Sequence, residues 1–236
     1  MVVTDPWADL LRLVTGPGDP PAMEADPGPQ SAAALIRRRF GLALPPPFAG
    51  RPAPGDAEPV RPAVPADAAA IAAVKWRAFG VNYRGGILAD AFLDQREVVP
   101  PVGFWTGRAL RGPTPRHRLW VWGRPGTVFG YADTGPVHPD DADPDRPDAG
   151  EVFELYVDPA AQGLGGGSRL LRAAEEGLAE AGFAGAELST ITTNQAARAF
   201  YEGRGWAATG AVRHVDLGVV AFDEVRYARR LAGGPS

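Results

Sequence analysis

Residues 156–171 read YVDPAAQGLGGGSRLL. An apolar run that ends in Asp158-Pro159 is followed by four glycines among the five positions 163–167, and then by a helical pattern. The first turn of a helix carries backbone N–H groups without intrahelical partners and a partial positive charge, so it attracts anions such as phosphate. Glycines there let a ligand approach the backbone closely. The stretch therefore predicts a strand, a turn and a helix that begins at an anion-binding loop.

Three other interpretations of this loop need weighing. A Walker loop requires a lysine before Ser168, and glycine stands there, so that interpretation fails. A dinucleotide fingerprint requires its glycines directly after the strand, whereas residues 158–162 intervene here. The acidic Glu187, about 20 residues further on, keeps the dinucleotide interpretation open as a weak alternative. A glycine-rich turn that binds nothing also remains open at this point.

Composition excludes several functional classes. The 236 residues suffice for one large domain or for a domain with an appendage. A net charge of -4 argues against nucleic acid as a partner. The chain has no cysteine, which excludes disulfides and thiolate chemistry. The three histidines, His117, His138 and His214, lie far apart, so we expect no metal site.

The N-terminal part differs in composition from the rest. The first 66 residues hold 14 of the 25 prolines, with short helical patterns at 7–14 and 31–42. We expect residues 1–58 to be a proline-rich extension, partly disordered or docked through these helices, and residues 59–236 to form the main domain. The sequence shows no signal peptide and no run of about 18 apolar residues. A cytoplasmic protein without membrane contact is therefore expected.

The main domain shows strands and helices in mixed order. Asp67 stands where it can cap a helix that continues to Phe79. The run 151–157 alternates, which would place Glu151 on one face and Glu154 on the other. The predicted strands are 59–63, two around the turn 123–126, 151–157, 186–191, 206–213 and 219–231, and the other predicted helices are 89–97, 165–181 and 194–203. This pattern predicts an α/β fold of the mixed α+β type.

Two linked stretches carry a family resemblance. The first, Gln162-Gly163-Leu164-Gly165-Gly166-Gly167, follows Val157-Asp158-Pro159. The second, NQAARAFYEGRGW, spans residues 194–206. Together they resemble the signatures of the GNAT superfamily of N-acetyltransferases, Gln/Arg-x-x-Gly-x-Gly/Ala and Asn-x-x-Ala-x-x-Phe-Tyr-Glu-x-x-Gly-Phe. The resemblance covers about residues 59–231 and implies a central, mostly antiparallel twisted sheet flanked by helices.

The resemblance also implies a site for acetyl-CoA as co-substrate. Backbone N–H groups of residues 163–168 would hold the coenzyme A pyrophosphate, and the main chain of Leu155 and Val157 would pair with the pantetheine arm. Asn194 would hydrogen-bond the pantetheine, although asparagine is also a good helix N-cap. The full set of expected cofactor-binding residues is Leu155, Tyr156, Val157, Gln162, Gly163, Leu164, Gly165, Gly166, Gly167, Ser168 and Asn194.

Two residues match catalytic positions of the family. Tyr201 corresponds to the general acid that protonates the departing thiolate, with a core aromatic as the alternative role. Glu151 lies where some relatives keep a glutamate base that deprotonates the ammonium through a water molecule. Glu154, expected on the opposite strand face, is a rival for that role, and a solvated carboxylate is the alternative for Glu151.

The sequence says less about the amine that accepts the acetyl group than about the acetyl-CoA donor. The resemblance implies transfer of an acetyl group to a primary amine of a small molecule or peptide, by direct attack in a ternary complex of a monomer or homodimer. The aspartate-rich segment 133–148 is a hypothetical attractor for a cationic amine, with an ordinary solvated loop as the alternative. Trp76, Tyr83 and Trp105 would form an aromatic wall. The segment 76–86 departs from relatives that read WRAAYRG, so no particular amine is implied.

Two further functions stay open at this point. One is a catalytically inactive acyl-CoA-binding module that acts through a partner. The other is the weak dinucleotide-binding alternative.

Overall fold

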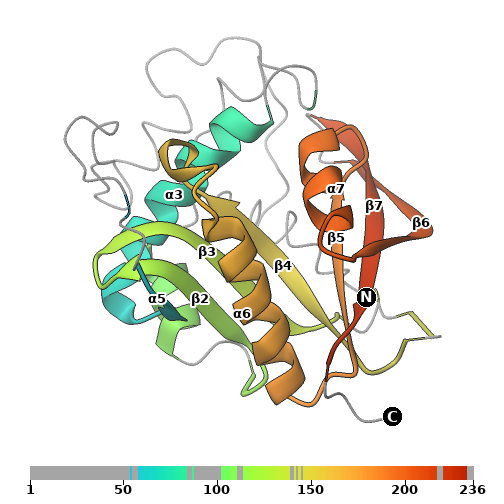
Figure 1. Ribbon diagram of the computed structural model, residues 1–236, viewed down its shortest axis with the longest axis horizontal. Coiled ribbons are helices and arrows are strands. Elements are labelled where there is room, and N and C mark those ends of the chain that lie inside the picture. The colour runs from blue at the N-terminus through green and yellow to red at the C-terminus, as the bar shows by residue number, and fades with distance from the viewer. Residues whose placement is uncertain are drawn as a thin grey trace, which may run out of the picture.

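The computed structural model describes residues 54, 58–83, 87, 102–110, 114–138, 141, 143–144, 146–216 and 220–232. They form a seven-stranded sheet with helices on both faces (Figure 1). The extension predicted over residues 1–58 lies outside the described residues apart from Pro54 and Glu58, and so does the helix predicted over 89–97. The division into an extension and a domain therefore stays a prediction.

The sheet is mixed and mostly antiparallel, which confirms the expected fold class. Its strand order is β1-β2-β3-β4-β5-β7-β6. Strands β4 and β5 run parallel, and every other neighbouring pair of these strands is antiparallel. The strands are β1 (Val60–Pro62), β2 (Arg118–Arg124), β3 (Thr127–Pro136), β4 (Ala149–Val157), β5 (Gly185–Ile191), β6 (Ala207–Asp216) and β7 (Ala221–Arg230).

Three of the four described α-helices lie close to their predicted positions. The α-helices are α3 (Ala68–Asn82), α5 (Val102–Leu110), α6 (Gly166–Glu180) and α7 (Gln195–Glu202), and the 3-10 helices are η1 (Pro65–Asp67) and η2 (Pro159–Ala161). Helix α5 was not predicted. Asp67 precedes α3 as expected, but its carboxylate does not cap that helix. It accepts hydrogen bonds from the N–H groups of Val64 and Gly126 and from Arg61 instead.

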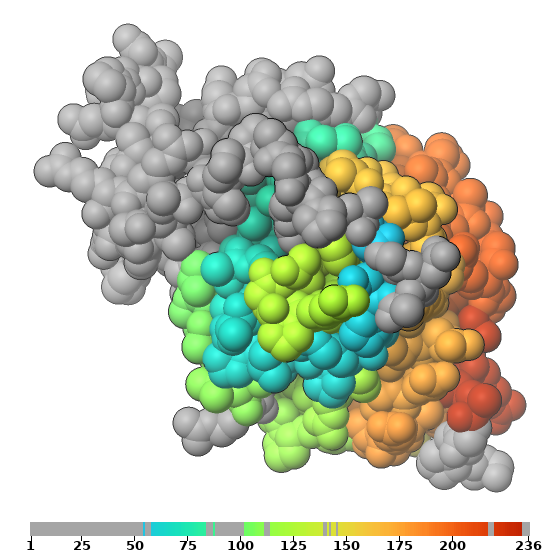
Figure 2. Space-filling view, turned by 60° about the vertical axis from the view of Figure 1, so that its left-hand side comes forward, coloured from blue at the N-terminus to red at the C-terminus, as the bar shows by residue number. Residues whose placement is uncertain are grey.

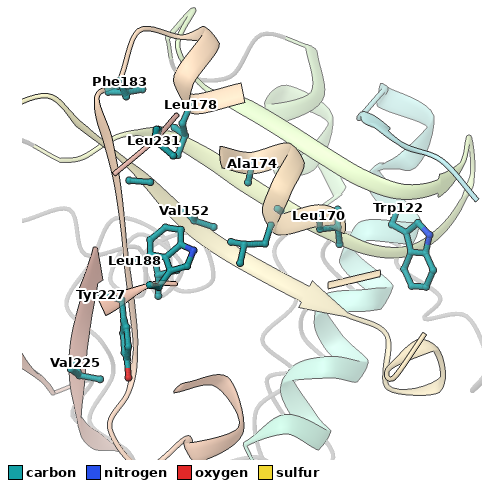
Figure 3. Close-up of a cluster of buried hydrophobic side chains, with 14 of the residues drawn as sticks. Trp122, Val152, Leu170, Ala174, Leu178, Phe183, Leu188, Val225, Tyr227 and Leu231 are labelled. Carbon is teal, nitrogen blue, oxygen red and sulfur yellow. The ribbon is translucent and has the colours of Figure 1, made fainter. Parts of the chain in front are cut away.

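Helix α6 covers one face of the sheet. Leu170, Ala174 and Leu178 recur at helical spacing and are fully buried. Figure 3 shows them in one cluster with Val152 of β4 and Leu188 of β5. This apolar stripe fixes α6 along the middle of the sheet, so that its N-terminus lies at the end of β4.

Helices α3 and α5 cover the opposite face. Ile71 and Val74 of α3 pack with Val121 of β2 and Tyr131 of β3, and Trp105 of α5 is fully buried among them. In the space-filling view, residues 58–83 (cyan) surround the turn between β2 and β3 (lime), with α6 (orange) beside them (Figure 2). None of the described helices is long and apolar enough to cross a membrane.

The sheet splits between β4 and β5. These strands pair only from Ala149–Glu151 to Gly185–Glu187 and then separate (Figure 1). Within β4, Glu154 pairs with Asp133 and Val152 pairs with Thr134, so Phe153 is an extra residue that forms a β-bulge. The bulge reverses the alternation of side chains. The prediction that Glu151 and Glu154 lie on opposite faces is therefore wrong, and both lie on the α3 face.

Candidate active site

Two adjoining pockets lie at this split. The gap pocket is lined by Lys75, Asn82, Tyr83, Glu151, Val152, Phe153, Glu154, Leu155, Tyr156, Ser189, Thr190, Ile191, Asn194, Ala197, Tyr201, Arg213 and Glu224. The loop pocket, of about 480 Å³, is lined by Asn82, Leu155, Val157, Ala161, Gln162, Gly163, Gly165, Gly166, Gly167, Ser168, Asn194, Ala196, Ala197, Phe200, Tyr201 and Arg204. The pockets meet at the residues they share, among them Asn82, Asn194 and Tyr201.

The turn before α6 is held by Asp158. This aspartate is fully buried and accepts a hydrogen bond from the backbone N–H of Ala160, which caps η2. Its other oxygen accepts from Arg77 of α3 at 2.6 Å. A buried carboxylate requires such a charged partner. The ion pair therefore fixes the turn against α3, and Asp158 does not face the loop pocket.

The glycines of the turn have different physical roles. Gly163 and Gly165 both have φ of 79°, which disfavours any residue with a Cβ. A Cβ on Gly166 would lie 2.1 Å from the ring of Trp122, so close packing requires glycine there. A Cβ on Gly167 would lie 3.4 Å from Phe200, an ordinary contact. The interpretation that all four glycines serve ligand approach is thus too simple, because backbone conformation and core packing account for three of them.

Most of the expected cofactor-binding residues line the loop pocket. Two do not: Leu164 is 54% exposed and lines neither pocket, and Tyr156 lines only the gap pocket. The Tyr156 hydroxyl lies 3.0 Å from that of Tyr83. Asn194 accepts a hydrogen bond from the N–H of Ala197 and caps α7, which confirms its alternative role. Its side-chain NH₂ group is a separate donor that this cap does not use.

Tyr201 lies where the two pockets meet. It is half-buried, and its ring packs against Phe200 and Tyr227. Its hydroxyl makes no hydrogen bond with any other described residue. Burial, together with the nearby Tyr83, raises the pKa of Tyr201 above its usual value. The side chain is therefore a neutral phenol at physiological pH, with a proton that it can donate into the pockets.

Glu151 and Glu154 share a face but have different surroundings. Glu154 forms an ion pair with the buried Lys75 and accepts a hydrogen bond from Tyr131. Glu151 makes no hydrogen bond with another described residue. Burial raises the pKa of Glu151 to about 7, with Arg226 opposing that shift. Glu151 is therefore able to take up a proton near neutral pH.

Charge separates the two pockets. Among the described lining residues, the gap pocket has three carboxylates, from Glu151, Glu154 and Glu224, and two cations, from Lys75 and Arg213. The described lining of the loop pocket has no carboxylate, and its charged side chain is Arg204. Sequence interpretation missed Arg204, although it lies within the second signature. In the gap pocket Lys75 pairs with Glu154 and Arg213 pairs with Glu224, which leaves Glu151 as the carboxylate outside these pairs. The loop pocket presents a cation, Arg204.

The aspartates of segment 133–148 are less available to a cationic amine than expected. Asp133 is not in a loop: it lies in β3, is buried and pairs with Arg108 at 2.7 Å. Asp141 pairs with Arg213, and Asp143 pairs with Arg146. The hypothesis that segment 133–148 attracts a cationic amine is therefore weakened, because arginines already pair with these three aspartates.

The expected aromatic wall is also reduced. Trp105 is fully buried in the core below α3, and Trp76 packs against the same cluster. Of the three predicted residues, Tyr83 lines the gap pocket.

Glu187, on which the dinucleotide alternative depended, is 1% exposed and bound by Arg146 and Arg226, so it does not face the loop.

Comparison with known proteins identifies the family of the chain. The model of the acetyltransferase (GNAT) family matches residues 86–206, just over half of the chain. Comparison with the curated proteins finds no match.

Solved structures share the fold. The PaiA N-acetyltransferase of Thermoplasma acidophilum, in complex with coenzyme A, is 15% identical over 73% of this chain and 98% of its own, with a TM-score of 0.56. YncA of Salmonella typhimurium, a putative acetyltransferase with acetyl-CoA, is 22% identical over 76% and 97%, with a TM-score of 0.54. The ribosomal-protein-alanine N-acetyltransferase of Brucella melitensis is 22% identical over 73% and 99%, with a TM-score of 0.54. The chain belongs to the GNAT family of acetyltransferases.

Proposed function

We propose that the chain transfers an acetyl group from acetyl-CoA to a primary amine of a small molecule or peptide. The amine attacks directly, with donor and acceptor bound at the same time. The observation that carries this proposal is that two pockets meet at Tyr201, one lined by the carboxylate of Glu151 and the other by the guanidinium of Arg204. An anionic donor and a cationic acceptor can each bind its own pocket and react where the two join.

The loop pocket fits coenzyme A. The first turn of α6 offers backbone N–H groups from Gly166 and Gly167, and no described carboxylate lines the pocket to repel phosphate. Beyond Glu151, no described strand pairs with β4 on the β5 side. The main chain of Leu155 and Val157 can therefore pair with the pantetheine amides as an added strand would. The solved structures of PaiA with coenzyme A and of YncA with acetyl-CoA support this placement.

The gap pocket fits the amine. A primary ammonium must lose a proton before its nitrogen can attack, and Glu151 is a base with a pKa of about 7. Glu154 is committed to Lys75 and Tyr131, so we assign the base role to Glu151. A water molecule can carry the proton from the ammonium to Glu151. When it is ionised, Glu151 also attracts an acceptor that arrives positively charged.

Tyr201 is the proposed general acid. Acetyl-CoA supplies the thioester carbon that the amine attacks. Ordinary pKa values of about 10 for a phenol and 8.5 for a thiol make proton transfer from Tyr201 to a thiolate uphill by about 2 kcal/mol. The burial that raises the pKa of Tyr201 would also raise that of a thiolate in the same place. The cost therefore stays small compared with a normal catalytic barrier.

Direct attack is favoured over a covalent enzyme intermediate. The chain contains no cysteine, which removes the usual thiol nucleophile of acyl transfer. No serine with a paired histidine lines either pocket among the described residues. A ternary complex is the remaining simple route.

An acceptor screen tests the proposal. The chain is incubated with acetyl-CoA and a panel of primary amines and peptides, and release of the free thiol is followed together with the mass of the acetylated product. Turnover with at least one amine is expected. Tight binding of acetyl-CoA with no turnover on any amine would favour the inactive binding module. Binding of NAD without binding of acetyl-CoA would favour the dinucleotide-binding alternative instead.

A further inference from the structure

Arg204 is held at the start of α6 by four contacts. It follows the end of α7, and it donates hydrogen bonds to the Ser168 hydroxyl from Nε at 3.1 Å and from Nη2 at 2.5 Å. Its Nη1 donates to the carbonyl of Phe200 at 2.7 Å. The guanidinium also stacks on the Phe200 ring, 3.8 Å from its centre. The charge of Arg204 is thus fixed in the wall of the loop pocket, beside the first turn of the helix.

The charge of Arg204 is not balanced by a described carboxylate. Other arginines of the domain form ion pairs, for example Arg77 with Asp158 and Arg108 with Asp133. The acceptors of Arg204 are a hydroxyl and a carbonyl, which are both neutral. Arg204 is half-buried in a pocket lined by no described carboxylate, so its positive charge is available to an anion that enters that pocket.

The donor inventory of Arg204 shows what it can still bind. A guanidinium has five N–H groups, one on Nε and two on each terminal nitrogen. The three hydrogen bonds use one N–H on each nitrogen, so one remains on Nη1 and one on Nη2. Two N–H groups on neighbouring nitrogens are the arrangement by which arginine binds phosphate oxygens in pairs.

We infer that Arg204 is the side chain that binds the pyrophosphate of coenzyme A, an assignment that rests on the proposed function. Its attachment to Ser168 places it beside the backbone N–H groups of the first turn of α6. Backbone and side chain then act on the same anion. The family signature at 194–206 does not assign this role, because its position before Gly205 is unspecified.

Binding calorimetry with three ligands tests the assignment: coenzyme A, 3′-dephospho-coenzyme A and pantetheine, which has no phosphate. Arg204→Gln removes the charge but keeps a side-chain amide within reach of Ser168. We expect its Kd for coenzyme A to rise by about tenfold or more, as for loss of a charge-assisted hydrogen bond. The same rise is expected with the dephospho ligand and none with pantetheine. Arg204→Lys should recover part of the affinity.

Arg172→Gln is the matched control. Arg172 lies in α6, is exposed and lines neither pocket, so its loss tests the general effect of one charge. Its Kd for coenzyme A should stay within about twofold of the unaltered value. Thermal unfolding of each variant shows whether the fold is kept.

Three results would overturn the assignment of Arg204 and leave the proposed function standing. These are an unchanged Kd for coenzyme A in Arg204→Gln, an equal loss of pantetheine binding, and a loss that disappears with the dephospho ligand. The second would show that Arg204 only ties α7 to α6, and the third that it contacts the 3′-phosphate. If the unaltered chain binds no coenzyme A, the proposed function falls and this assignment falls with it.

Discussion

At the scale of single residues, two glutamates three positions apart in β4 have different chemistry. Glu154 is held in a charged pair with Lys75, whereas Glu151 faces the gap pocket without a hydrogen bond to a described residue. Burial of Glu151 is only partly offset by Arg226 and Arg213, so its pKa rises to about 7. Environment, rather than residue type, selects the base.

The first prediction concerns the pH dependence of this base. Glu151 acts only when it is ionised, so kcat/KM should fall as pH decreases through about 7. Glu151→Gln should lose this inflection and about 10²-fold or more in kcat/KM. Glu154→Gln is the control, which should keep the inflection. Measurement of kcat/KM from pH 5 to 9 decides the matter, and an inflection near 7 that survives in Glu151→Gln would disprove the base assignment.

The second prediction concerns the proposed acid. Tyr201→Phe keeps the ring that packs against Phe200 but removes the proton. We expect kcat to fall by about 10²-fold, while the Kd for coenzyme A changes little. Tyr227→Phe is the matched control, because that hydroxyl binds Glu202 and lines neither pocket. An unchanged kcat in Tyr201→Phe would show that Tyr201 is only a packing residue.

At the scale of elements, the sequence predicts features that depend on neighbouring residues, but it does not predict contacts between segments far apart in the chain. Helices α6 and α7 follow from apolar spacing, a glycine turn and an asparagine cap, all within a few residues of each other. The bulge at Phe153 arises from pairing with β3, and the ion pairs of Asp133 and Asp141 join segments far apart in the chain. No pattern within one segment encodes such partners.

Asn194 and Tyr201 illustrate the boundary between what the sequence could and could not predict. Their positions in the second signature were enough to place them near the cofactor loop, where both line the loop pocket. The sequence could not show that the Asn194 oxygen caps α7 or that Arg204 reaches Ser168. These contacts depend on how α7 lies against α6.

The third prediction separates two neighbouring glycines of α6. Alanine gains about 0.5–1 kcal/mol over glycine within a helix. Gly166→Ala would place its Cβ 2.1 Å from the Trp122 ring, and such overpacking costs about 1–3 kcal/mol. Gly167→Ala meets Phe200 at an ordinary 3.4 Å, so it should keep or increase the free energy of unfolding. Urea unfolding measures both, and equal values for the two variants would contradict the packing argument.

At the scale of the whole molecule, the active site lies between two parts of one sheet. Strands β1 to β4 form one part and β5 to β7 the other, and the two parts are joined by the short parallel pairing of β4 with β5. Glu187 lies buried at this junction and binds Arg146, which precedes β4, and Arg226 of β7. The same carboxylate raises the pKa of Glu151 through its negative charge. The junction that holds the two parts together therefore also influences the base.

The fourth prediction tests this double role with Glu187→Gln. Breaking a buried charged network leaves arginines without their carboxylate and costs about 3–5 kcal/mol of the free energy of unfolding. Removal of a nearby negative charge also lowers the pKa of Glu151, so the inflection in kcat/KM should move below 7. Urea unfolding and the pH profile measure the two effects separately.

Glu175→Gln is the control that separates stability from electrostatics. Glu175 is bound to Trp206 and Arg229 on the α6 side of the sheet, away from Glu151. Its loss should lower the free energy of unfolding without moving the inflection, because it lies outside the charged cluster around the base. An inflection that stays near 7 in Glu187→Gln, or one that moves equally in Glu175→Gln, would show that the junction and the base are independent. A downward shift in Glu187→Gln alone would mean that the contact joining the two parts of the sheet also sets the pH at which the enzyme works.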